Sequence, residues 1–250
     1  MIKKIEIQNH FKQSELQRRL KEVQLKGFPN IKIYKDANIQ IKNITPEEIE
    51  KNLFVPQPTV YSVGFLDRID ELANLFSAKG IDIFKLNGGV DYTAYSDEET
   101  TDWTIIPPVI ERAQINFTNK HLNYNLHLSN EVRGYMERTN CDLNPELANL
   151  SYPEYPNSGS HPIDIVCDGS HRIQSGIEKK ISQNIILIAS SKSGFPYYAA
   201  PKPYSEVHIE NKRPPEGGND KTHILKSPAH KSLYRLFPTG GILNGTVRPE

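Results

Sequence analysis

Residues 162–190, PIDIVCDGSHRIQSGIEKKISQNIILIAS, decide which fold this chain can adopt. Residues 163–167 are mostly apolar and β-branched, which predicts a strand. A turn follows, and the spacing of apolar residues then predicts a helix over about 171–181. The apolar residues recur every four positions, at Ile173, Ile177 and Ile181. Residues 185–189 are almost wholly apolar and predict a second strand in the interior of a sheet. The stretch therefore predicts a strand–turn–helix–strand unit of an α/β or α+β domain.

A polar cluster, Asp168-Gly169-Ser170-His171-Arg172, lies where this helix begins. Free backbone N–H groups and the positive end of the helix dipole favour anions there, phosphate above all. Gly169 permits a tight turn and close approach of a ligand to the backbone. Arg172 can bind a phosphate through two hydrogen bonds, and His171 can donate one bond or move a proton. Asp168 could hold Mg²⁺ or orient a hydroxyl nucleophile. The alternative is that Asp168 or Ser170 simply caps the helix.

The same five residues, placed between an apolar strand and a helix, resemble the DGxHR or GxxR signature of the ParB/sulfiredoxin-like superfamily. This superfamily includes ParB clamp proteins, sulfiredoxin, free-serine kinases, and DndB- and SspE-type DNA phosphorothioation proteins. The resemblance implies a domain with a mixed sheet that handles nucleotides. It implies ATP or another NTP, with Mg²⁺, as cofactors. It further implies phosphate binding by Gly169, Ser170, His171 and Arg172, catalytic roles for Asp168 and His171, and Asp168 as the metal ligand.

Two departures from the family pattern disfavour the activities of sulfiredoxin and of the free-serine kinases. Sulfiredoxin has its catalytic cysteine directly before the motif histidine, where this chain has Ser170, so Cys167 is interpreted as a core residue. Free-serine kinases have an acidic residue after a Val-Pro-Thr segment. The similar segment here, residues 55–59, has no carboxylate, so another acceptor, or another base such as Glu71 or Glu111, would be needed.

The favoured function is an enzyme, an Mg²⁺-dependent ATP phosphotransferase or NTPase that acts on a small-molecule phosphate acceptor or on water. The alternative is a nucleotide-gated DNA-binding or regulatory protein, and a nuclease is a third, less favoured hypothesis. The sequence contains no GxxxxGK[ST] and no GxSxG motif, which disfavours P-loop and serine-hydrolase chemistry.

Composition supports an intracellular protein without bulk nucleic-acid affinity. The 250 residues include 30 Lys and Arg against 30 Asp and Glu, so the chain is neutral overall. A neutral chain is not expected to coat DNA by electrostatics alone, although the composition allows a local basic patch. The 2 cysteines form no metal-binding pattern, and no apolar run predicts a membrane span or a signal peptide. We expect a cytoplasmic protein with no membrane contact.

Two regions are predicted along the chain. Residues 1–44 form an extension, with a helix capped by Ser14 and continuing to about Lys26. Two short strands, 31–34 and 39–41, follow this helix as a hairpin. Residues 45–250 form the ParB/sulfiredoxin-like nucleotide-binding domain.

Within that domain, Thr45 begins a helix, and an amphipathic helix covers residues 65–79. Residues 104–111 are read as a strand and residues 87–89 as a loop. About 112–161 is an insertion, read as a lid or as a decoration of the fold.

The C-terminal region supplies further candidate contacts. A strand is predicted at 206–210 and a short basic and aromatic helix at 229–237. Its cations could close over nucleotide phosphates or contact the DNA backbone. The candidate substrate or phosphate contacts are Lys202, His230, Lys231 and Arg235.

Overall fold

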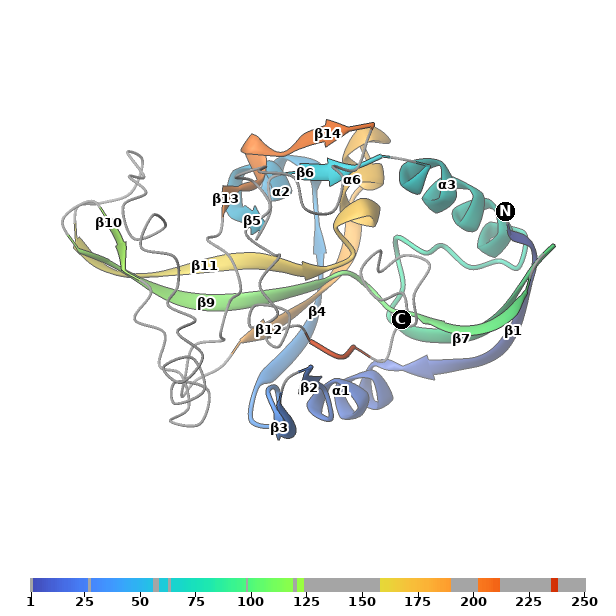
Figure 1. Ribbon diagram of the computed structural model, residues 1–250, viewed down its shortest axis with the longest axis horizontal. Helices are drawn as coiled ribbons and strands as arrows, with labels where there is room; N and C mark the ends of the chain where they lie inside the picture. Colours follow the sequence, from blue (N-terminus) through green and yellow to red (C-terminus); the bar gives the residue numbers. More distant parts are fainter. Residues whose placement is uncertain are drawn as a thin grey trace, which may run out of the picture.

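The computed structural model describes residues 2–26, 28–55, 59–62, 64–97, 99–118, 121–123, 158–189, 202–211 and 235–237. These residues form an α+β fold with mixed sheets, as predicted (Figure 1). The helices are α1 (Gln13–Lys21), α2 (Pro46–Asn52), α3 (Phe65–Ser77) and α6 (Ser170–Glu178), with a 3-10 turn η1 (Tyr204–Glu206). None of the described helices is long and apolar enough to cross a membrane.

The main sheet has the strand order β13-β5-β11-β9-β12-β4, with β10 paired to the far end of β9. Its strands are β4 (Asn38–Ile44), β5 (Leu53–Val55), β9 (Val109–Thr118), β10 (His121–Asn123), β11 (Ser158–Asp168), β12 (Gln183–Ala189) and β13 (Lys202–Pro203). The β5–β11 and β9–β12 pairs are parallel, whereas the other pairs are antiparallel. The predicted strand–helix–strand unit is β11–α6–β12, and β12 is an interior strand as expected.

A second sheet of three strands lies beside the main one, in the order β1-β7-β8 (Figure 1). Its strands are β1 (Ile2–Lys12), β7 (Gly88–Ser96) and β8 (Thr100–Ile105). Helix α3 packs on this sheet through Ile69, Leu72 and Phe76, which share one helix face and are buried. Two small pairs complete the described structure. They are β2 (Gln24–Leu25) with β3 (Phe28–Lys32), and β6 (Thr59–Tyr61) with β14 (His208–Glu210).

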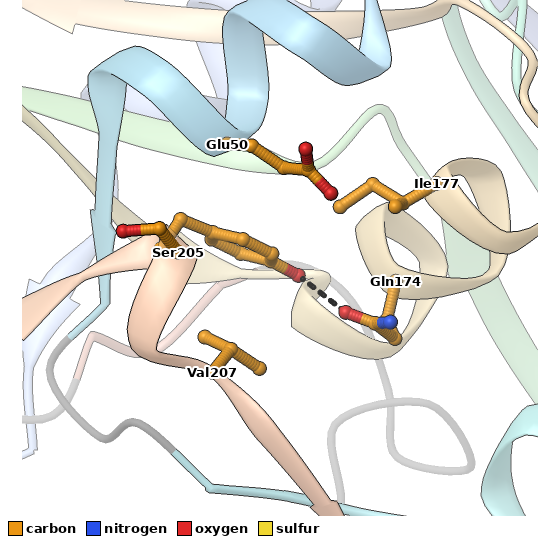
Figure 2. Close-up of a pocket in the computed structure, with 6 residues that line it drawn as sticks. Glu50, Gln174, Ile177, Ser205 and Val207 are labelled. Atoms are coloured by element: carbon orange, nitrogen blue, oxygen red, sulfur yellow. Dashed lines mark hydrogen bonds between the residues drawn. The ribbon is translucent and has the colours of Figure 1, made fainter.

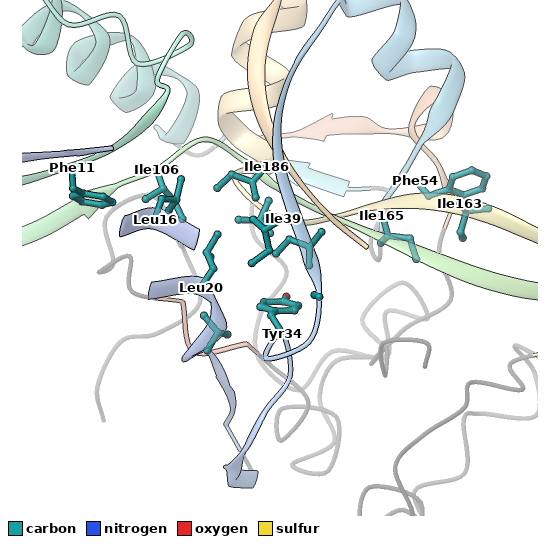
Figure 3. Packing of buried hydrophobic residues seen from close by; sticks show 14 residues of the cluster. Phe11, Leu16, Leu20, Tyr34, Ile39, Phe54, Ile106, Ile163, Ile165 and Ile186 are labelled. Carbon is teal, nitrogen blue, oxygen red and sulfur yellow. The ribbon is translucent and has the colours of Figure 1, made fainter. Parts of the chain in front are cut away.

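The two faces of the main sheet carry separate cores because successive side chains of a strand point to opposite sides. On one face, α2 and α6 cover a cluster that includes Ile49, Ile110, Val166 and Ile173. On the other face, α1 inserts Leu16 and Leu20 toward Ile165 and other strand residues (Figure 3). Polar residues on opposite faces of the main sheet are separated by the sheet and cannot belong to one site.

The N-terminal region differs from the prediction in three ways. Helix α1 begins directly after β1, no side chain caps it, and it ends at Lys21, so the cap assigned to Ser14 and the end near Lys26 are wrong. The strands read as a hairpin do not pair with each other, because β3 pairs with β2 and β4 pairs with β12. The pairings β1–β7 and β4–β12 both cross the predicted boundary at residues 44/45. The division into an extension and a domain stays a prediction.

The region before β9 also needs correction. The glycines at 88 and 89, read as a loop, begin β7, because they pair with the end of β1. The predicted strand at 104–111 is two strands, since β8 ends at Ile105 and β9 begins at Val109. Between them lie two prolines, Pro107 and Pro108, which have no N–H group for a sheet ladder. This break brings Pro108 to the start of α6.

Other local predictions are confirmed. Thr45 and Glu48 form the reciprocal capping box of α2, and α3 is the predicted amphipathic helix. The strand predicted at 206–210 is shorter, with η1 followed by β14. The predicted insertion begins inside β9 and ends inside β11, and residues 124–157 lie outside the described part of the chain.

Candidate functional site

The candidate site begins where β11 ends and α6 starts. The residue before the helix is Gly169, in the left-handed region at φ 82°, and no side chain caps the helix. The plain cap by Asp168 or Ser170 is therefore not what the structure has. A Cβ atom on Gly169 would lie 2.9 Å from Cβ of Pro108. The chain thus has a helix start without a side-chain cap, where Gly169 packs closely on Pro108. The free N–H groups of such a helix start can bind an anion.

We expect Gly169→Ala to destabilise the protein more than the same change at Gly64, which precedes α3. Both glycines have positive φ, which costs an L-residue about 1–2 kcal/mol. A Cβ on Gly64 would meet nothing within 4 Å, whereas one on Gly169 meets Pro108. Urea unfolding of the two variants measures the difference. Equal losses of stability would contradict the close packing of Pro108 on the helix start.

Arg172, in the first turn of α6, is the most unusual residue of the site. The residue is only 4% exposed to solvent. Its Nε and Nη1 atoms have no hydrogen-bond partner among the described residues. Burial lowers the pKa of Arg172 to about 10, although Asp168 and Tyr92 oppose this shift. A buried cation with unused donors is costly unless an anion or a hydrogen-bond acceptor reaches it. The geometry therefore provides a cationic group that a bound anion would satisfy.

Asp168 lies beside this arginine and has an altered acidity. Burial raises the pKa of its carboxyl to about 6, and the Arg172 charge and the Gly169 N–H limit the increase. A carboxyl with a pKa near 6 changes its protonation state close to physiological pH. Such a group can accept a proton or bind a cation when ionised, and can tolerate a neighbouring anion when protonated.

Tyr92, on β7, is a site residue that the sequence did not indicate. It is 3% exposed and packs edge-to-face on Phe76, with ring centroids 4.9 Å apart. Burial raises the pKa of Tyr92 and Arg172 lowers it, so the phenol lies within electrostatic range of the guanidinium. Tyr92 was missed because its strand was not predicted. It brings the second sheet into the site.

Helix α3 forms another wall of the site. The ring of Phe65, in its first turn, lies 4.9 Å from the His171 ring, and the Arg68 guanidinium lies 5.6 Å from the Phe65 ring. Further along, Asp70 accepts a hydrogen bond from Ser175 at 3.0 Å and pairs with Lys179 at 2.6 Å. The Phe65–His171 contact joins the first turns of α3 and α6, and the Asp70 contacts join the two helices further along. His171 is therefore positioned by an aromatic ring from another helix.

The described residues contain no group of three or more His, Cys, Asp or Glu that could enclose a metal ion. Asp168 offers one carboxylate at the helix start. Mg²⁺ in nucleotide sites is commonly held by one or two carboxylates together with phosphate oxygens and water. The described residues therefore fit a Mg²⁺ ion that arrives with a nucleotide, and among them no set of ligands forms a metal site of its own.

Of the other predicted contacts, Arg235 needs correction. Its Nε and Nη2 atoms donate to the carboxylate of Glu111 at 2.8 and 2.7 Å, and the two side chains are 2% and 0% exposed. Glu111 lies on the opposite face of the main sheet from α6, because its neighbour Ile110 belongs to the cluster under that helix. Arg235 therefore does not reach the phosphate site, and Glu111 is not the alternative base.

Of the remaining candidates, only Lys202 lies in the described part of the chain. Lys202 lies on the edge strand β13, paired with Val55. His230 and Lys231 lie outside the described residues, and residues 235–237 are not helical, because Arg235 forms a bridge with Leu25. The roles assigned to Lys202, His230 and Lys231 stay predictions.

A buried cluster surrounds the Glu111–Arg235 pair. The Tyr34 hydroxyl donates to Glu111, and Phe237 stacks on Tyr34 with ring centroids 6.2 Å apart. Cys167 packs against the same core, and burial, followed by the Glu111 charge, raises the pKa of its thiol. The interpretation of Cys167 as a core residue agrees with this environment, since an inert thiol is expected there.

Comparison with known families adds one finding. The family model of the ParB CE domain matches residues 15–128. Residues 15–128 are therefore similar to the ParB CE domain. The matched part runs from α1 through β9 and β10, whereas the Asp168–Arg172 motif lies outside it. The match therefore supports a ParB-like assignment independently of the Asp168–Arg172 motif. No curated protein and no solved structure gives a significant match.

The ParB-like stretch supplies part of the candidate site. It contains α3 with Phe65 and Arg68, β7 with Tyr92, and Pro108 before β9. The β11–α6–β12 unit adds Asp168 and Arg172. The site thus lies where the ParB-like stretch meets the unit that the sequence motif identified.

Proposed function

We propose that this ParB-like protein binds a nucleoside triphosphate with its phosphates at the start of α6, and that it transfers the terminal phosphoryl group to a small molecule or to water. The observation that supports this proposal best is Arg172, a buried cation with two unused donors in the first turn of an uncapped helix. A phosphate fits because it can accept hydrogen bonds from the guanidinium and from backbone N–H groups together.

The residues around Arg172 then have distinct roles. Gly169 lets a phosphate approach the backbone, and Ser170 and His171 offer further hydrogen bonds at its edge. Ionised Asp168 orients the hydroxyl acceptor or water and takes its proton as the terminal phosphoryl group moves to the attacking oxygen and the nucleoside diphosphate leaves. In its alternative role, Asp168 would hold a Mg²⁺ ion together with the phosphates, and the ion would neutralise charge on the phosphate oxygens.

Calorimetry with ATP, ADP, CTP and GTP, each with Mg²⁺, tests the binding step. We expect micromolar binding of at least one triphosphate by the wild-type protein, and slow release of inorganic phosphate that Asp168→Asn abolishes. Absence of binding for all four nucleotides would overturn the proposal. Nucleotide binding without release of phosphate would show a nucleotide-binding protein and would contradict the proposed enzymatic activity.

The pKa of Asp168 predicts the pH dependence of this binding. Because its pKa is about 6, the carboxyl is ionised above that pH and is protonated below it. A protonated carboxyl does not hold Mg²⁺ or accept a proton, so turnover and Mg²⁺-dependent affinity should fall as the pH is lowered from 7.5 to 5. Nucleotide phosphates also titrate in this range, so Asp168→Asn is the control. A pH profile in Asp168→Asn that matches wild type would contradict the role of Asp168.

The second candidate is a nucleotide-gated DNA-binding or regulatory protein, which the ParB CE match supports. The described basic helix does not favour it. On α1, Arg19 is bonded to Asp91 at 2.9 and 3.0 Å, and Arg18 is bonded to Glu15 at 2.7 Å. Fluorescence anisotropy with duplex DNA, with and without the bound nucleotide, separates the candidates. Salt-dependent binding that appears only with nucleotide would favour the regulatory role.

A further inference from the structure

A cavity of about 240 Å³ lies between α2, α6 and η1, at the other end of α6 from the phosphate site. Its lining residues are Glu50, Gln174, Ile177, Tyr204, Ser205 and Val207 (Figure 2). The liquid volume of one water molecule is about 30 Å³, so the cavity has room for a small organic molecule. Nothing in the phosphate chemistry described above uses it.

The lining combines aliphatic side chains with neutral polar groups and one carboxylate. Ile177 and Val207 supply the aliphatic surface. The Tyr204 hydroxyl donates to the amide oxygen of Gln174 at 3.3 Å, which holds the phenol in place. The one ionisable side chain besides this phenol is the carboxylate of Glu50, and none of the six lining residues is basic. An anionic ligand would therefore find no counter-charge here.

Three features favour a cation in the cavity, although Lys51 and Lys179 lie at the ends of the same two helices. Glu50 lines the cavity directly. Burial raises the pKa of Tyr204, and the Glu178 and Glu50 charges raise it further, so both carboxylates act on the cavity wall. Ile177 lies in the last turn of α6, where the negative end of the helix dipole favours cations. The same helix thus favours an anion at its start and a cation at its end.

We propose that this cavity is a second ligand site, for a small amine whose ammonium group pairs with Glu50 and whose apolar body packs on Ile177 and Val207. The ligand class follows from the shape and charge of the lining. The site is separate from the nucleotide site and does not depend on it.

Methyl NMR of Ile177 and Val207 tests the proposal with three probes of matched size, namely benzylamine, benzyl alcohol and benzoate. We expect saturable shifts at Ile177 with benzylamine, weaker binding of benzyl alcohol and no binding of benzoate. Glu50→Gln should weaken benzylamine about two- to fivefold, as expected for a partly solvated ion pair, and should leave benzyl alcohol unchanged.

Two control variants show whether a change in benzylamine affinity comes from Glu50 itself. Glu47 and Glu50 are both exposed carboxylates of α2, but only Glu50 lines the cavity, so Glu47→Gln should leave benzylamine affinity unchanged. Arg172→Met should also leave it unchanged, whatever happens to nucleotide binding. The proposal is overturned if no probe shifts Ile177, if benzoate binds as well as benzylamine, or if Glu47→Gln and Glu50→Gln weaken benzylamine equally.

Discussion

Replacing Arg235 with methionine should lower the free energy of unfolding by about 3–5 kcal/mol, the usual cost of leaving one partner of a buried ion pair uncompensated. The Glu111 carboxylate is fully buried, and Arg235 contacts both of its oxygens. Methionine fills much of the space but leaves the carboxylate with the neutral Tyr34 hydroxyl and Cys167 thiol beside it and no counter-charge from Arg235. Urea unfolding followed by circular dichroism measures the loss.

Two further variants identify the cause. The double variant Glu111→Gln/Arg235→Met removes both charges and should recover a large part of the lost stability, because the penalty comes from the unpaired charge. Arg18→Met removes an exposed ion pair with Glu15 and should leave stability close to that of the wild type. If Arg235→Met behaved like Arg18→Met, the buried pair would not support the fold.

Replacing Arg172 with methionine should have the opposite effect on stability and should remove nucleotide binding. Burial lowers the pKa of Arg172 from 12.5 to about 10, which corresponds to about 3 kcal/mol of unfavourable burial. Its unused donors add to this cost. Asp168 loses the neighbouring charge that lowers its pKa, and this carboxyl can take up a proton instead of remaining an unpaired anion, so we expect the ligand-free variant to be more stable than wild type. Affinity for the triphosphate should fall about 100-fold or more, since two charge-assisted hydrogen bonds are lost.

Thermal unfolding with and without Mg²⁺–ATP measures both effects in one experiment. The wild-type protein should gain stability with nucleotide, because a ligand that binds only the folded state stabilises it. Arg172→Met should show a higher midpoint without nucleotide and no gain with it, while Arg18→Met should follow wild type in both. If Arg172→Met lost stability and still bound nucleotide, both the unfavourable burial of Arg172 and its role in phosphate binding would be contradicted.

The two arginines show why burial alone does not predict the role of a charged residue. Both are buried, one on each face of the main sheet. Arg235 faces a carboxylate that satisfies it, so it contributes to the fold, whereas Arg172 has donors that no described residue satisfies. A protein that retains such a cost commonly does so at a functional site.

The sequence by itself predicted the elements whose pattern is local. The β11–α6–β12 unit, the capping box of Thr45 and the amphipathic face of α3 are each encoded by residues a few positions apart, and each is confirmed. The same local pattern located the polar cluster at the start of α6. It could not show that Gly169, rather than Asp168 or Ser170, precedes the helix, because this depends on contact with Pro108.

Only the tertiary structure decided which distant residues meet. Strand β7 begins with glycines that read as a loop, and it becomes a strand because β1 and β8 pair with it on both sides. That pairing places Tyr92 beside Arg172. Arg235 and Glu111 are 124 residues apart, and the alternation of side chains across β9 turns them away from α6. Hydrophobic periodicity carries information over one element, whereas strand pairing and the choice of sheet face depend on residues far apart in the chain.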